Sequence, residues 1–350
     1  MKRSGNVTIY DIASEAGVSA STVSRVLNGT AKVDPQKIAA VEAVIAKYRY
    51  RPSAAAQQLS EKHSRVIGMV CPDVRNAYYA NLFVECERAA FERGYTLTLN
   101  NSFGAEETEI AFMERLAQHA ECILLCGGVI DWNPLPQKFR ETLESTVRRV
   151  PVVVAGEVDM DGLIRIGIDQ EAVMRLSVMH LNRLGHTKIA FLHGYGHIYQ
   201  TQMKLKAYAD TMRELGLPVR GEYLVNAGTF DDAAGAAGMQ RILSLGDLPT
   251  AVIATNDLMA AGAMQTVLRL GFRVPDDFSI IGCDDSPIAS LTHPNITGIR
   301  YDYAAYADQM IEAAVSAAEG VYTPPRRIMP ALVMKDSCAR RAPGRTGHGE

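Results

Sequence analysis

The 350-residue sequence lacks the patterns by which several classes of enzyme are recognised. No phosphate-binding glycine loop of the GxGxxG or Walker type follows a candidate strand, and the glycine clusters Gly127-Gly128 and Gly194-Tyr-Gly196 do not have the spacing of such loops. Serine, histidine and aspartate residues that could form a triad occur in any chain of this length. We therefore expect a protein that is not an enzyme and that has no catalytic residues and no cofactor.

Cysteine is scarce, and the six residues do not form a metal-binding pattern. Cys122 and Cys126 lie within one apolar run, and no second pair of matching spacing is present. Buried, reduced thiols are therefore expected, and no metal site.

Long hydrophobic runs are also absent. No window approaches the roughly 20 uncharged apolar residues of a membrane-spanning helix, and the N-terminal segment lacks the apolar core of a secretory signal. We expect a cytoplasmic protein without a membrane partner.

Positive and negative charges nearly balance over the whole chain, which has a net charge of −3, but they are unevenly distributed. Residues 1–65 contain ten Lys and Arg against five Asp and Glu, a net charge of +5, which leaves −8 for residues 66–350. The N-terminal segment is therefore the part of the chain suited to contact with phosphate groups.

Residues 8–29 contain the most specific pattern, which predicts two short helices around a glycine. Thr8 and Asp11 have the spacing of a capping box at a helix start. Gly17 allows the left-handed backbone that ends the first helix, and Ser19 can cap a second one. A helix-turn-helix results, whose inward-facing side chains at helical spacing are Ile9, Ile12, Ala13, Ala16, Val23, Val26 and Leu27.

The outward face of the second helix is small and polar, with Ala20, Ser21, Ser24 and Arg25. Such a face fits the major groove of DNA, where an arginine can pair with guanine through two hydrogen bonds. A third helix is expected from Asp34-Pro35, burying Ile38, Val41, Val44, Ile45 and Tyr48. The alternative is a set of three short helices in an all-α subdomain without a role in DNA binding.

The continuation Tyr50-Arg-Pro-Ser-Ala-Ala-Ala-Gln-Gln-Leu-Ser-Glu-Lys62 favours DNA binding. The run from Thr8 to Lys62 resembles, densely and in order, the headpiece and hinge of the LacI/GalR family of bacterial transcriptional regulators. The resemblance implies a headpiece over residues 1–50 and a hinge over residues 51–64.

In that family the segment matching Ser53 to Leu59 becomes helical on the operator, and the leucine wedges into the minor groove. About seven residues are too few for a stable free helix, and the alternative is an ordinary linker with one exposed leucine. The expected DNA contacts are Thr8, Ser19, Ala20, Ser21, Thr22, Ser24, Arg25, Asn28, Ala56 and Leu59.

From about Arg65, short apolar runs alternate with amphipathic stretches, which predicts an α/β fold of doubly wound parallel sheets. The predicted strands are 66–70, 96–99, 122–125, 152–155, 188–192, 251–254 and 279–282. Two such lobes match the periplasmic-binding-protein-like core of the resembled family, with the chain crossing back near Pro294–Arg300. We expect an N-terminal lobe over residues 65–162 and 297–330, a C-terminal lobe over 163–293 and a disordered tail over 339–350.

The loops after the strands are the candidate effector site, because ligands bind beyond the carboxyl ends of strands in such sheets. After the first strand, Asp73, Asn76, Tyr78 and Tyr79 resemble a family segment that places aromatic rings at the mouth of a cleft. A tyrosine at a helix start is equally compatible with simple packing.

Two further loops contain Asn256-Asp257 and Asp284-Asp285, which match ligand positions of the family. We expect Asn256 and Asp284 to bind hydroxyl groups, and Asp257 and Asp285 to act as caps or supports. The alternative is that these residues only cap helices.

The segment Lys204-Leu-Lys-Ala-Tyr208 departs from the family pattern, which has an arginine at the first position. A lysine cannot clamp two hydroxyls as a planar guanidinium does, but it can hold one carboxylate, so Lys204 suggests a sugar acid. The alternative is a solvated lysine on a helix face. Phe230 and Tyr301 match a stacking position and a polar contact of the family.

The sequence thus predicts a transcriptional regulator, most simply a repressor, that binds a pseudo-palindromic operator in double-stranded DNA as a homodimer. Its effector would be a sugar or sugar acid held between two lobes. The alternative is a regulator with a purine or another non-sugar corepressor. A transport binding protein would share the core but would have no headpiece.

Overall fold

The computed structural model describes residues 7–28, 33–48, 50, 64–158 and 160–341. The chain divides into two compact units, one up to Ser64 and one from Arg65 onward. Among the described helices, none is both long and apolar enough to cross a membrane.

The first unit contains helices α1 (Ile9–Glu15), α2 (Ala20–Asn28) and α3 (Pro35–Tyr48) around a small apolar core. The fully or nearly buried side chains are Ile12, Ala13, Val23, Val41 and Val44. The predicted burial of Tyr48 is wrong, because 41% of this residue is exposed and its hydroxyl donates to Glu15.

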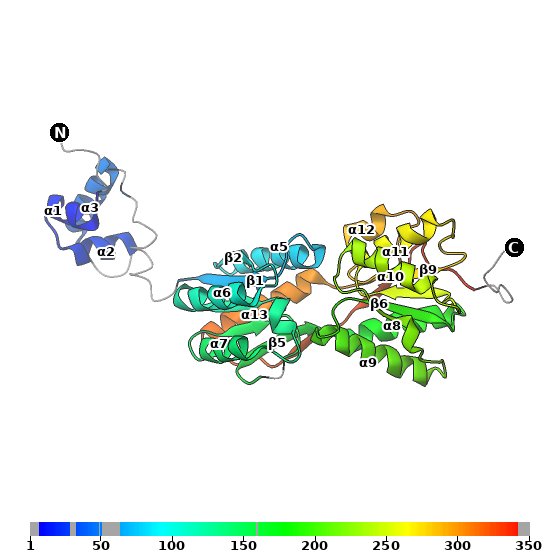
Figure 1. The fold of residues 1–350 in the computed structure, drawn as a ribbon. Coiled ribbons are helices and arrows are strands. Elements are labelled where there is room, and N and C mark those ends of the chain that lie inside the picture. Colours follow the sequence, from blue (N-terminus) through cyan, green and yellow to red (C-terminus); the bar gives the residue numbers. More distant parts are fainter. Residues whose placement is uncertain (1–6, 29–32, 49, 51–63, 159, 342–350) are drawn as a thin grey trace. The chain divides into compact units, whose positions relative to one another are not determined.

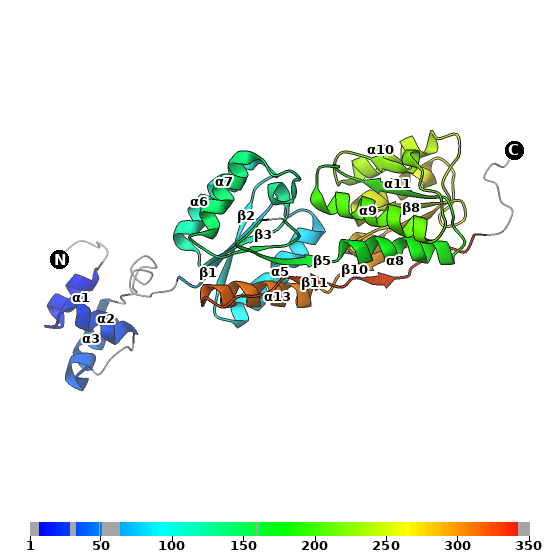
Figure 2. The same ribbon diagram turned by 90° about the horizontal axis from the view of Figure 1, so that it is seen from below.

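A six-stranded parallel sheet forms the N-terminal lobe, with strand order β2-β1-β3-β4-β5-β11. The strands are β1 (Val66–Cys71), β2 (Thr96–Asn101), β3 (Cys122–Leu125), β4 (Val152–Val154), β5 (Leu163–Ile168) and β11 (Arg326–Ile328). Helices α5 (Ala77–Glu92) and α13 (Tyr303–Ala318) cover one face, and α6 (Glu106–His119) and α7 (Gln137–Val147) cover the other (Figure 2).

A four-stranded parallel sheet forms the C-terminal lobe, with strand order β7-β6-β8-β9. The strands are β6 (Ile189–His193), β7 (Leu224–Asn226), β8 (Ala251–Ala254) and β9 (Ser279–Ile281). Figure 1 shows α10 (Asp232–Leu243) and α11 (Asp257–Arg269) above the sheet, and α8 (Gln170–Arg183) and α9 (Tyr199–Glu214) below it. The short helices η2 (Gly221–Tyr223) and α12 (Pro287–Leu291) complete the lobe.

The chain passes between the lobes along strands β10 (Gly298–Arg300) and β12 (Ala331–Val333), which pair antiparallel. After β12 it returns to the C-terminal lobe, where Ser337 donates to the carbonyl of Ile280 and Ala339 N donates to Ser279 Oγ. Arg341 N donates to the carbonyl of Leu184.

Two of the expected boundaries are corrected by this topology. The N-terminal lobe does not end at residue 162, because β5 continues its sheet to Ile168. The tail does not begin at residue 339, because residues 339–341 are bonded to the C-terminal lobe, and residues 342–350 lie outside the described part. Strands β5, β7, β10, β11 and β12 were not predicted.

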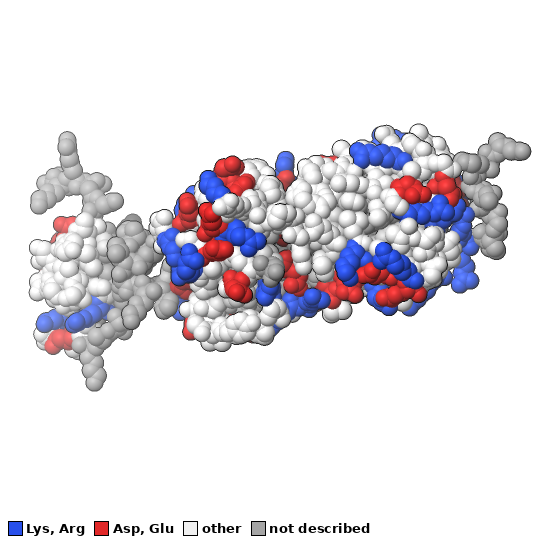
Figure 3. Space-filling model, turned by 60° about the horizontal axis from the view of Figure 1, so that its bottom comes forward, with Lys and Arg blue, Asp and Glu red and all other residues white. Residues whose placement is uncertain are grey.

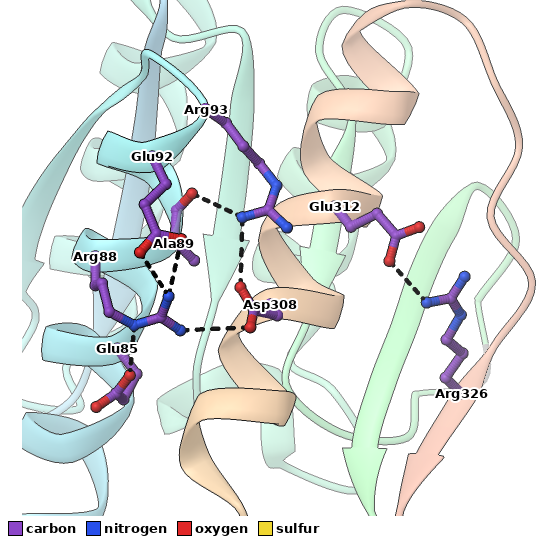
Figure 4. A network of polar contacts seen from close by, with 8 residues as sticks. All are labelled: Glu85, Arg88, Ala89, Glu92, Arg93, Asp308, Glu312 and Arg326. Carbon is purple, nitrogen blue, oxygen red and sulfur yellow. Dashed lines mark hydrogen bonds and ion pairs between the residues drawn. The ribbon is translucent and has the colours of Figure 1, made fainter.

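Helix α13 belongs to the N-terminal lobe although it is separated from β5 by the whole C-terminal lobe in sequence. Its Asp308 accepts from Arg88 of α5 at 3.4 Å and from Arg93, just after α5, at 3.4 Å, and Glu312 accepts from Arg326 of β11 at 3.1 Å (Figure 4). These pairs are partly exposed, so each contributes at most about 1 kcal/mol. The larger contribution comes from the buried Ala307, Met310 and Ile311 of α13.

Candidate functional site

The first helix begins with the capping box that the sequence predicts. Thr8 Oγ1 accepts from Asp11 N at 3.3 Å, and Asp11 Oδ2 accepts from Thr8 N at 2.9 Å. Gly17 follows α1 with φ +67°, a backbone that favours glycine. The turn between α1 and α2 therefore has the predicted local cause.

The first turn of α2 presents a group of hydroxyls. Ser19 Oγ lies 2.8 Å from Ser21 Oγ and 2.9 Å from Thr22 Oγ1, and it accepts from Thr22 N. A helix N-terminus with free hydroxyls favours contact with a phosphate, because its N–H groups carry partial positive charge.

Of the predicted DNA contacts that the structure describes, Thr8 caps α1, and the others lie on α2 or at its start. Ser21 and Arg25 are exposed, and Ala20, Thr22 and Ser24 are half-buried. Asn28 is the last residue of α2. The described residues do not include positions 51–63 of the hinge, where Ala56 and Leu59 are located.

A cavity of about 830 Å³ lies between the two lobes of the second unit. It opens beyond the carboxyl ends of the strands and is lined from both sheets where their strand order reverses, next to β1 and β3 and next to β6 and β8. All nine predicted effector positions line this one cavity, namely Asp73, Asn76, Tyr78, Tyr79, Lys204, Phe230, Asn256, Asp284 and Tyr301. Their binding of an effector stays a prediction.

Lys204 is buried in the wall of the cavity, so the alternative of a solvated lysine is wrong. Its ammonium donates to the carbonyl and the hydroxyl of Thr255, at 3.2 and 3.3 Å. Burial raises the pKa of Asp284, while the nearby charge of Lys204 and a hydrogen bond from Tyr301 act against this rise. Lys204 therefore favours the charged form of this buried acceptor.

Asp284 also has an unusual backbone. Its φ is +94°, in the region that favours glycine, and its N–H donates to the carbonyl of Ile299 on the crossing segment. Strained backbone of this kind is found where the surroundings fix a functional side chain. This backbone places the Asp284 carboxylate in the cavity wall, beside the segment that joins the lobes.

The supporting roles predicted for Asp257 and Asp285 are confirmed. Asp257 Oδ2 accepts from Ser286 N at 2.6 Å and Ser286 Oγ at 2.8 Å, and burial raises the pKa of Asp257. Asp285 pairs with Arg300 and Lys335, both at 2.7 Å. These contacts hold the loop that carries Asp284.

Two predicted ligand residues also cap helices, and for Asn256 the sequence analysis had given this role to its neighbour Asp257. Asn256 accepts from Met259 N at 2.9 Å and donates to the carbonyl of Phe230 at 2.8 Å. Asn76 accepts from Tyr78 N at 3.0 Å. Both side chains thus have their orientation fixed by the protein.

The rim of the cavity carries charges that are already paired. Arg75 donates to Asp73 through two nitrogens, at 2.9 and 2.7 Å. Arg327 pairs with Glu157 at 3.2 Å and with Asp169 at 3.8 Å. Elsewhere on the core, Lys, Arg, Asp and Glu intermingle on the face that Figure 3 shows.

Glycines allow two aromatic rings to reach the cavity. A Cβ on Gly194 would lie 2.4 Å from the ring of Phe230, and a Cβ on Gly127 would lie 2.3 Å from the hydroxyl of Tyr79. Gly127 also has a φ of +82°. A side chain at either position would displace a ring from the wall.

The sequence analysis missed the segment after β3, which contacts the opposite lobe. Asp131, at the end of η1 (Gly128–Asp131), accepts from Gln200 of α9 at 2.6 Å. Asn133 N donates to the carbonyl of His197, and Asn133 Nδ2 donates to Gln202 Oε1 at 2.7 Å. The signal was present, since this loop also follows a strand end, but it matches none of the family segments that were compared.

The cysteines are free, and five of the six are buried. Among the described residues, no group of three or more His, Cys, Asp or Glu side chains is placed to hold a metal ion.

The comparisons with known proteins match both units. A family model described as bacterial regulatory proteins, lacI family, matches residues 8–53, and one described as a periplasmic binding protein-like domain matches residues 178–338. Catabolite control protein A of Priestia megaterium is 32% identical over 87% of this chain and 92% of its own length. The HTH-type transcriptional regulator GalR of Salmonella typhimurium is 31% identical over 97% of this chain and 98% of its own length.

A solved structure resembles the whole described fold. The lac repressor dimer bound to operator and the anti-inducer ONPF superposes with a TM-score of 0.84 at 26% identity, covering 96% of this chain and all of that one.

Proposed function

Because the chain belongs to the LacI family of DNA-binding transcriptional regulators, which are not enzymes, we propose that it is a cytoplasmic repressor controlled by a small carbohydrate-type effector. The observation that carries this proposal is the cavity itself, because strand ends from two lobes surround about 830 Å³ with polar and aromatic side chains. A volume of this size suits a small ligand.

The lining favours hydroxyl groups over a carboxylate. Lys204 is the one buried Lys or Arg among the described residues, and it is held by Thr255 beside Asp284. A sugar acid would place a second negative charge near Asp284 without meeting a free cation. We therefore propose a ligand without a carboxylate, in place of the sugar acid that Lys204 alone suggests.

The coupling between ligand and DNA would arise from closure of the lobes. A ligand that contacts both lobes favours the closed arrangement over the open one, and the two headpieces of a dimer need one separation to reach both half-sites. The ligand then changes operator affinity, and the operator changes ligand affinity by the same factor.

The function is tested by selecting operator sites from random duplex DNA with the full-length protein. A sugar panel is then screened by thermal shift, and the operator is titrated with each compound that binds. Selection of a pseudo-palindromic site whose affinity responds to a bound sugar supports the proposal. Binding of all duplexes with equal affinity, or an operator affinity that no bound compound changes, would contradict it.

Arg25→Ala is expected to weaken specific binding by about 1–3 kcal/mol, because Arg25 is exposed on the outward face of α2. Binding to random DNA should change much less. Fluorescence anisotropy with the selected operator and with a scrambled duplex separates the two effects. An equal loss on both duplexes would show that Arg25 contacts only phosphates.

We also propose a homodimer, for which α5 and α12 offer exposed apolar side chains. Val84 and Phe91 of α5 are 59% and 80% exposed, and Leu291 of α12 is 79% exposed. Both helices lie along the upper side of the core in Figure 1. Exposed apolar side chains of this size are candidates for burial in a subunit interface.

Phe91→Glu is therefore expected to convert the dimer to a monomer and to weaken operator binding, because one headpiece reaches only one half-site. Light scattering coupled to size exclusion measures the mass of both proteins. An unchanged mass for the Phe91→Glu variant would place the interface elsewhere.

A further inference from the structure

The cavity wall carries more negative than positive charge. Its acidic residues are Asp73, Asp131, Glu157, Asp169, Asp231 and Asp284, and its basic residues are Arg75, Lys204 and Arg327. Arg75 neutralises Asp73, and Arg327 lies between Glu157 and Asp169. Asp231 caps α10 by accepting from Ala234 N at 2.7 Å. Asp131 is left without a cation.

Asp131 is only 8% exposed, and its one recorded hydrogen-bond partner is the amide nitrogen of Gln200. The charged or titratable groups that act on it or feel its charge are Tyr78, Tyr79, Glu109, Cys126 and Tyr306, and none of them is a cation. Burial raises the pKa of Asp131 to about 7. A buried carboxylate in such surroundings is costly to ionise unless a positive charge approaches it.

A second polar atom beside Asp131 also needs a donor. The amide nitrogen of Gln200 is used by Asp131, and its oxygen, Oε1, is buried without a hydrogen-bond partner. Gln170, also in the wall, has a buried and unpartnered Oε1 as well. Two residues of the cavity wall therefore hold a buried acceptor without a donor, and one of them, Gln200, contacts Asp131.

An ammonium group matches the Asp131 carboxylate and the unpartnered amide oxygens better than a hydroxyl does. It carries a positive charge and three donors with no acceptor, whereas a hydroxyl donates once and brings an acceptor that must itself be satisfied. Hydrogen bonds between an ammonium and a carboxylate are also the stronger ones.

Aromatic rings surround the same part of the wall. Trp132 follows Asp131 directly and lies edge-on to His197 of the other lobe, with ring centroids 5.1 Å apart. Tyr79 lies close enough to feel the charge of Asp131, and Tyr195 lies on the other side of His197. All four rings line the cavity. Aromatic faces attract cations, and an acidic residue among aromatic side chains is a common arrangement for binding an amine.

We propose that the effector is an amino sugar or a similar amine-bearing polyol, whose protonated amine contacts Asp131 beside Gln200 while its hydroxyls face Asp284 and Asn256. This inference rests on the proposed function, since it names the ligand class of the same cavity. Because Asp131 and Gln200 come from different lobes, the amine would bridge the lobes where they already meet.

The proposal is tested by calorimetry on the full-length protein with glucosamine, galactosamine and mannosamine. Each is paired with its parent hexose and its N-acetyl derivative, which have the same ring without the charge. At least one amino sugar should bind about tenfold or more tightly than both of its neutral partners, as expected for a charge-assisted contact in a buried site.

Asp131→Asn keeps the shape of the side chain and removes the charge, so it should eliminate this preference while leaving the neutral sugars nearly unaffected. Gln200→Met removes both the orphan oxygen and the amide donor to Asp131, so it should also weaken binding of the amine. Glu141→Gln, an exposed charge change on α7 of the same lobe, is the control and should preserve the preference. Melting curves of all variants verify that they are folded.

Equal or tighter binding of the neutral partner would overturn the proposal, as would a preference for the amine that survives Asp131→Asn or a lack of binding by all three amino sugars. A neutral sugar that binds and changes operator affinity would overturn only this inference and leave the proposed function intact. A protein whose operator affinity responds to none of the bound compounds would instead contradict the proposed function.

Discussion

Lys204→Met is expected to weaken effector binding by about 10- to 100-fold, because a hydrogen bond from the ligand to a charged acceptor contributes about 1.5–3 kcal/mol and Asp284 would lose its charge. Lys204 is buried, donates to Thr255 and holds down the pKa of Asp284. Methionine has a similar length and no charge, so burial would raise the pKa of Asp284 further and favour its neutral form. A neutral Asp284 is a poorer acceptor for ligand hydroxyls.

Lys206→Met is the matched control, since Lys206 lies on the same helix but is exposed and paired with Asp210 at 2.7 Å. Its loss should change effector affinity by less than about threefold, because exposed ion pairs contribute about 1 kcal/mol or less. Calorimetry with the best-binding compound measures both variants, and operator affinity without effector should stay near that of the unchanged protein. Similar losses in the two variants would show that Lys204 contributes only through the overall charge of α9.

Val23→Asp is expected to abolish specific DNA binding while leaving the melting of the second unit unchanged. Val23 is fully buried in a small core, in which five apolar side chains of the described residues are buried. A small unit of this size is marginally stable, and an unpaired buried charge costs several kcal/mol. The first unit would unfold, whereas the second is a separate compact unit.

Ala39→Asp controls for the added negative charge, because Ala39 is exposed on α3. It should repel phosphate to a similar degree and keep the unit folded. Operator binding is measured by anisotropy, and melting of the second unit by calorimetry with the effector present and absent. Specific binding retained by Val23→Asp would mean that this three-helix unit is not the DNA-binding element.

The sequence predicts the structure best where residues that are close together in the chain determine the local backbone. Thr8, Asp11 and Gly17 act within a few residues, so their capping box and turn could be predicted. Most of the seven predicted strands are apolar on both faces, which is the pattern of buried parallel strands, whereas 96–99 alternates Thr and Leu. Strand β5 was missed because Arg165 interrupts its apolar run, and β10, β11 and β12 are three residues each.

The cavity could be predicted only in part, for a physical reason. Asn256 and Asp284 follow strands directly, so the general position of ligand sites in such sheets identifies them. The pair Asp131–Gln200 joins two lobes across 69 residues of sequence, and no local pattern encodes that approach. The burial of Lys204 likewise depends on Thr255 of another strand end.

The most direct test of the account is the operator affinity of the full-length protein, measured with and without a compound that binds the cavity. We predict that saturating compound changes the operator affinity by about fivefold or more, which is within the usual range of allosteric coupling. At the same concentration, the compound should not change the operator affinity of the Lys204→Met variant. An operator affinity that stays constant while the cavity is saturated would contradict the claim that this cavity controls DNA binding.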